Sequence, residues 1–145
     1  MTGLTGSTRR QTAQRFVMQI GRRDIDQAIE LLSPGVRYHV LGNHALAGTF
    51  SGPEEVRKHL ISLDDRTLGT FEAIKWEDWL VGEDHVAALA TIRMSAGGKL
   101  FTGRHLFLAE FDVADMIVGI TIFFEDEASA LRFFGPPALP EDHQP

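Results

Sequence analysis

The spacing of apolar residues changes once along this chain, near Asp64–Arg66, and that change limits the folds available to it. Before this point apolar residues recur every three or four positions, which is the period of a helix with one buried face. Beyond it they recur at every second position, which is the period of a half-buried strand. Helices followed by a run of strands predict an α+β protein whose helices cover one face of an antiparallel sheet.

Local signals divide the first part of the chain into three helices and one strand. Asp24 is a good N-cap residue, and Pro53 followed by Glu54 and Glu55 is typical of a first helical turn. Ser33-Pro34-Gly35 should stop the second helix, and a loop of small residues should lead to Gly52. We therefore expect helices over about 8–21, 24–32 and 53–62, and a strand over 36–41.

In the second part, turns rich in Gly and Asp separate segments of alternating pattern. These segments predict an antiparallel meander, strongly bent and closed by the helices around an internal pocket. We expect one domain over 8–135, a flexible N-terminus at 1–7 and a Pro-rich tail at 136–145, which has too little apolar content to fold alone. The expected strands are about 71–81, 86–95, 99–111 and 116–124, and a brief helix should follow over 126–133.

Composition excludes several classes of function. The chain carries 14 Lys and Arg against 20 Asp and Glu, a net charge of −6, without a basic run. Binding to nucleic acid or to an anionic membrane surface is therefore not expected. There is no cysteine and no metal-ligand motif, so we expect no disulfide, thiolate nucleophile, metal or cofactor. Without an apolar run of about 20 residues or an export signal, the expected location is the cytoplasm.

Several short stretches follow one another in a recognisable order: 14–17, 23–26 and 31–34, the glycine-bounded loop with the start of the next helix at 42–56, and 123–126 with 133–135. Together they resemble the NTF2-like superfamily, and particularly its SnoaL-like branch of polyketide cyclases and relatives of ketosteroid isomerase. The resemblance covers about residues 8–135. It implies a cone-shaped, strongly bent, mostly antiparallel sheet wrapped around helices, described as an NTF2-like or cystatin-like α+β barrel. It also implies an apolar small-molecule ligand and a homodimer formed through the sheet face.

The resemblance also supplies roles to compare. In ketosteroid isomerase an Asp base faces an oxyanion hole made of a Tyr and a protonated Asp. Here His39 matches the base, just before Gly42, while Phe16 and Phe107 match the two oxyanion-hole donors. Neither phenylalanine side chain can donate such a hydrogen bond. The resemblance therefore does not extend to a true steroid isomerase.

Two histidines are the candidate acid–base residues, because imidazole titrates near neutral pH. The spacing of His39 to the following loop glycines favours a catalytic role, although alternation also fits a partly exposed strand histidine. Tyr38 is the substitute if the register is shifted by one residue. His105 is in phase with Phe107 and other inward residues of its strand, so a structurally satisfied core histidine is its alternative. Converging on one pocket, the two histidines would provide an acid and a base.

Other residues are candidates for ligand contact. Arg93 is expected to bind an acidic or enolate oxygen, unless it lies on a solvated strand face. Trp76 and Trp79 are three apart in a strand, so they should point to opposite faces, with one of them in the pocket or an interface. Asp126 is expected to cap the last helix. The full set of expected ligand-binding residues is Phe16, Tyr38, Phe50, Trp76, Arg93, Phe107 and Phe123.

Two functions stay open at this point. The first is a cofactor-independent enzyme that uses acid–base chemistry for cyclisation, isomerisation or dehydration of a polyketide-like or terpenoid-like molecule. The second is a non-catalytic module that binds a small molecule or forms dimers. Because the same fold serves both functions, only the residues of the site can distinguish them.

Overall fold

The structure, a computed structural model, describes the backbone of residues 2–137 and the side chains of residues 8–137. The part of the expected Pro-rich tail from residue 138 onward lies outside these residues. Four helices are present in this part of the chain, and the first begins earlier and the third ends later than expected. None of the described helices is long and apolar enough to cross a membrane. The helices are α1 (Thr2–Gly21), α2 (Ile25–Ile29), α3 (Pro53–Arg66) and α4 (Glu127–Phe134).

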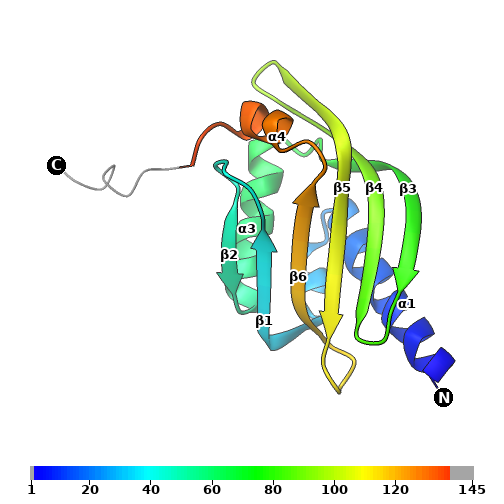
Figure 1. Ribbon diagram of the computed structural model, residues 1–145. Helices are drawn as coiled ribbons and strands as arrows, with labels where there is room; N and C mark the ends of the chain where they lie inside the picture. The colour runs from blue at the N-terminus through cyan, green and yellow to red at the C-terminus, as the bar shows by residue number, and fades with distance from the viewer. Residues whose placement is uncertain (1, 138–145) are drawn as a thin grey trace.

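Six strands form one sheet in the order β2-β1-β6-β5-β4-β3. Only β1 and β6 pair in parallel, and the other neighbours are antiparallel, as the meander pattern predicts. Figure 1 shows the long strands β3, β4 and β5 side by side, with the short strand β2 at the opposite edge. The strands are β1 (Leu32–Val40), β2 (Gly48–Ser51), β3 (Glu72–Val81), β4 (His85–Ala96), β5 (Lys99–Phe111) and β6 (Ile117–Phe124).

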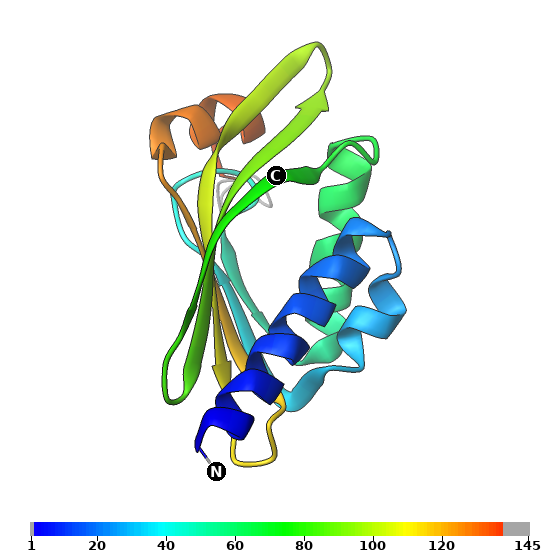
Figure 2. The same cartoon turned by 90° about the vertical axis from the view of Figure 1, so that its right-hand side faces the viewer.

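The helices α1, α2 and α3 lie on one side of the bent sheet (Figure 2). The core fills the space between them, because alternate residues of each central strand point toward the helices. In β4 every second residue from Val86 to Met94 is buried, and β5 shows the same alternation from His105 to Phe111. The expected α+β architecture with a bent sheet is confirmed.

Arg9 of α1 links the helix to one end of the sheet by hydrogen bonds. Its guanidinium Nε donates to Asp115 Oδ1 at 2.7 Å, and its other nitrogens donate to the carbonyl oxygens of Glu83 and Asp112 at 2.7 and 3.1 Å. The residue is only 8% exposed. One side chain thus joins α1 to the β3–β4 and β5–β6 turns, and so holds the helix across the sheet.

Two segments differ from the expectation at the start of the sheet. β1 begins at Leu32, although Ser33-Pro34-Gly35 was expected to end the second helix and precede the strand. The pairing of β1 with β6 is irregular between Leu32 and Arg37. Proline is tolerated in a strand at such an irregularity. The segment Gly48–Ser51 was expected to be a loop, yet it pairs with β1 as an edge strand. Its four residues are mostly exposed and so carry little hydrophobic pattern.

Candidate functional site

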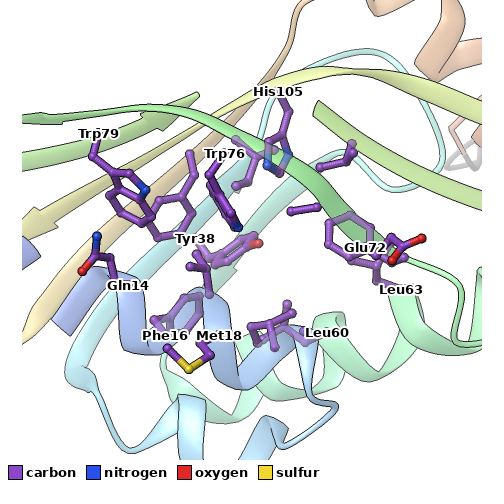
Figure 3. Close-up of a pocket in the computed structure, with 18 residues that line it drawn as sticks. Gln14, Phe16, Met18, Tyr38, Leu60, Leu63, Glu72, Trp76, Trp79 and His105 are labelled. Carbon is purple, nitrogen blue, oxygen red and sulfur yellow. The ribbon is translucent and has the colours of Figure 1, made fainter. Parts of the chain in front are cut away.

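A cavity of about 560 Å³ lies between the sheet and the helices α1 and α3. Figure 3 shows its walls, with Trp76, Trp79 and His105 on one side and Phe16, Met18 and Leu60 on the other. Its lining is mainly apolar, which is typical of small-molecule sites. The lining residues are Gln14, Phe16, Val17, Met18, Ile20, Gly21, Tyr38, Leu60, Leu63, Phe71, Glu72, Ala73, Trp76, Trp79, Ile92, His105, Phe107 and Ile122.

The floor of the cavity is aromatic. Phe16 of α1 and Phe107 of β5 stack with ring centroids 5.9 Å apart, and both are almost fully buried. These are the two positions that match the oxyanion-hole donors of ketosteroid isomerase. Both rings shape the cavity, and because a phenylalanine side chain carries no polar atom, neither offers a hydrogen bond to a ligand.

Tyr38 reaches the cavity from β1, on the face of that strand that also buries Val36 and Val40. Its phenol makes no hydrogen bond to any side chain or backbone group of the described residues. Burial raises the pKa of this phenol well above its usual range, because the charged phenolate would be poorly solvated. Tyr38 therefore presents a neutral O–H donor inside an apolar cavity.

His105 enters the same cavity from β5 and is 7% exposed. Its imidazole lies near the rings of Phe71 and Phe124, with centroids 6.3 and 6.2 Å away, and has no hydrogen-bond partner among the described residues. Burial lowers its pKa to about 4. The imidazole is thus neutral near physiological pH, with one nitrogen able to accept a proton and the other able to donate a hydrogen bond.

Trp76 and Trp79 both line the cavity, with ring centroids 5.4 Å apart, so the expectation that they point to opposite faces was wrong. The reason is a local irregularity of β3: its pairing with β4 shifts between Trp76 and Asp78. A bulge inserts one extra residue and so restores the same face after three positions. The second tryptophan was missed for this reason.

Charge is nearly absent from the lining. Among the described residues around this cavity, only Glu72 has a side chain that is normally charged, and it forms an ion pair with Arg93. No lysine or arginine lines it. The cavity therefore suits an uncharged ligand, since a buried charge without a partner is costly.

Four of the expected site residues lie elsewhere. His39 points away from Tyr38, and its Nδ1 lies 2.9 Å from Thr49 Oγ1 on the other face of the sheet, so the structure does not bring His39 and His105 together. Alternation along β1 explains this, since neighbouring residues face opposite sides. Arg93 and Phe123 are likewise on the outer face, 51% and 36% exposed. Phe50 lines a separate, second cavity.

The remaining expected residues meet in one place. Phe16, Tyr38, Trp76, His105 and Phe107 all line the first cavity. Several residues of α1 also line the cavity and were not predicted from the sequence, among them Gln14 and Met18. The helical period that places Phe16 inward also places Ile20, four positions further on, on nearly the same face, so this signal could have found Ile20. Gln14 and Met18 are each two positions from Phe16, and the same period does not point to them.

Comparison with known proteins agrees with this architecture. The SnoaL-like domain family matches residues 13–120. The uncharacterized protein Rv0034 of Mycobacterium tuberculosis is 29% identical over 122 residues, which cover 83% of this chain and 92% of that protein.

Two solved structures share the fold. Bal32a, from a soil-derived mobile gene cassette, aligns with a TM-score of 0.84 at 21% identity, covering 90% of this chain and 98% of that one. TerC, co-crystallized with polyporic acid, aligns with a TM-score of 0.76 at 14% identity over 88% and 98% of the two chains. Because the family match covers most of its length, the chain belongs to the SnoaL-like domain family, and its fold is that of NTF2-like proteins.

Proposed function

We propose that this protein is a cofactor-independent enzyme that transfers protons on an uncharged, largely apolar small molecule held in the first cavity. The observation that carries the proposal is the presence of two neutral polar side chains, Tyr38 and His105, in one cavity whose lining is mainly apolar. Neither side chain has a hydrogen-bond partner among the described residues, and a ligand in the cavity would supply one. Cyclisation, isomerisation and dehydration are the reaction types this supports.

The two side chains take different roles. The free imidazole nitrogen of His105 removes a proton from carbon next to a carbonyl group, and the electron pair of that C–H bond moves toward the carbonyl oxygen. The O–H of Tyr38 donates a hydrogen bond to this oxygen as it becomes negative. Negative charge on the ligand in turn stabilises the imidazolium, because opposite charges attract strongly in an apolar cavity. The proton then returns to another atom of the ligand.

His39 is not part of this proposal, since it lies on the outer face of the sheet. Tyr38, its neighbour, takes the place at the cavity that the family resemblance had suggested for His39. Glu72 is the one normally charged side chain among the described lining residues, and this near-absence of charge supports a neutral ligand. TerC, which shares this fold, was co-crystallized with polyporic acid. The proposed ligand class is therefore a polyketide-like or terpenoid-like molecule.

Deuterium exchange tests the chemistry directly. The bicyclic ketone 2-tetralone is incubated with the protein in deuterium oxide, and loss of the proton signals next to its carbonyl is followed by NMR. We expect exchange above the buffer rate, abolished by His105→Gln and reduced by Tyr38→Phe. His39→Gln is the matched control and should leave the rate unchanged. An active His105→Gln protein would overturn the assignment.

A second function, binding without catalysis, has its own support. The two oxyanion-hole donors of ketosteroid isomerase are replaced by Phe16 and Phe107, which leaves Tyr38 as the single phenol at the cavity. In that case 2-tetralone would bind, quenching the fluorescence of Trp76 and Trp79, but no exchange would exceed the buffer rate.

We further propose a homodimer formed through the outer face of the sheet, as the family resemblance implies. Large apolar side chains are exposed there, including Phe123. Sedimentation at micromolar concentration tests this, and a purely monomeric protein would contradict it.

A further inference from the structure

Helix α3 separates the first cavity from a second one of about 310 Å³. Leu60 and Leu63 face the first cavity, whereas residues on the other side of the helix face the second. The two cavities share no lining residue, so each has its own chemistry. The second is lined by Ala45, Leu46, Phe50, Glu55, Lys58, His59, Ser62 and Arg66.

His59 forms the back wall of this second cavity. It is only 5% exposed, and its ring stacks on Phe50 with centroids 4.2 Å apart while also contacting the Tyr38 ring at 5.1 Å. Neither imidazole nitrogen makes a hydrogen bond to another of the described residues. A polar ligand group in the cavity would supply the hydrogen-bond partner that this imidazole lacks among the described residues.

Two cationic side chains flank this histidine. Lys58 and Arg66 make no ion pair with any described residue, in contrast to Arg57 on the same helix, which pairs with Asp26 at 2.8 Å. Arg66 Nε donates to Ser62 Oγ at 3.3 Å, so a hydroxyl lies beside the guanidinium. The one carboxylate in the lining, Glu55, is engaged by the backbone N–H of Ser51 at 2.7 Å.

The arrangement suits an anion with a flat apolar body. Arg66 and Lys58 can hold a carboxylate by charge-assisted hydrogen bonds, and the apolar side chains of Leu46 and Phe50 can cover a ring. From this geometry we propose that the second cavity binds a small aromatic carboxylate, with its charged end between Lys58 and Arg66 and a hydrogen bond from His59. This ligand differs in kind from the uncharged molecule proposed for the first cavity.

Binding of a carboxylate in the second cavity would change the pKa of His59. Burial, together with the nearby Arg66, lowers the pKa of this imidazole to about 4. The ionisable groups that face it are Glu55, Lys58 and Arg66 on α3, with the neutral phenol of Tyr38 on β1. A carboxylate placed here adds a negative charge and must raise the pKa of His59.

The test uses benzoate as the probe and benzamide as its uncharged counterpart. The imidazole signals of His59 are followed by NMR and assigned with a His59→Asn variant. Trp76 and Trp79 are the only tryptophans of the chain and both lie in the first cavity, so their fluorescence reports on that cavity alone. Arg66→Gln is compared with Lys75→Gln, which removes the same charge from an exposed position on β3.

We expect benzoate to shift the His59 signals in a saturable way and to raise the pKa of His59, with benzamide inert and tryptophan fluorescence unchanged. Arg66→Gln should weaken binding about tenfold, the loss of one charge-assisted hydrogen bond, and Lys75→Gln should not weaken it. The proposal is overturned by an unsaturable response, by equal weakening in both variants, or by a fluorescence response without movement at His59. None of these results bears on proton transfer in the first cavity.

Discussion

Replacing His105 by glutamine should remove a pH-dependent loss of stability. In the folded protein, burial lowers the pKa of this imidazole to about 4, against an ordinary value of 6.5. As the pH falls between these values, the unfolded chain takes up a proton on His105 and the folded chain does not, so acid favours unfolding. The difference corresponds to about 3 kcal/mol of unfolding free energy, fully present above pH 6.5 and lost by about pH 4.

The measurement is urea unfolding of the wild type and of His105→Gln at neutral pH and at about pH 4. Glutamine keeps a polar side chain but does not titrate. The wild type should lose about 3 kcal/mol more than the variant. His59 has a similarly lowered pKa, but its contribution is present in both proteins and cancels. Equal losses in the two proteins would show that His105 is well solvated, which would refute the description of this histidine as buried in an apolar cavity.

Three further changes test the fold around the site. Arg9→Met breaks the hydrogen bonds to Asp115 and two turns, and thermal or urea unfolding should show a loss of about 2 kcal/mol. Gly42→Ala places a methyl group 2.8 Å from Cδ2 of the fully buried His44 ring at a φ of 125°, so it should cost at least about 2 kcal/mol, whereas Gly97→Ala meets no atom within 4 Å and should cost less. Asp126→Ala removes the side chain that accepts from Ser129 N–H, and circular dichroism should show a lower melting temperature.

Much of the fold could be predicted because burial follows sequence period so closely. Alternation in β5 placed His105 on the inward face together with Phe107, and both line the first cavity. The N-cap at Asp126 followed from the same local rules and is confirmed, since its side chain accepts a hydrogen bond from Ser129. These features depend on neighbours within a few residues, which a single sequence contains.

The rest depends on contacts that no local pattern encodes. The bulge in β3 puts Trp76 and Trp79 on one face, and its position is set by pairing with β4. Whether Tyr38 or His39 reaches the cavity depends on which face of β1 meets the helices. Alternation placed Tyr38 on the apolar face of the strand, whereas the family resemblance favoured His39. Arg93 forms an ion pair with Glu72, which lies 21 positions away in the sequence. Registers and pairings of this kind are tertiary, so period arguments do not supply them.

The central claim is that His105 and Tyr38 contact an uncharged ligand in the first cavity. The most direct test is NMR of the histidine side chains during titration with 2-tetralone and with 2-naphthol. The account predicts that the His105 signals move and saturate, that Tyr38→Phe weakens binding, and that the His39 signals stay where they are. If the His105 signals ignore both ligands, or if His39 responds in its place, the assignment of this cavity as the functional site is contradicted.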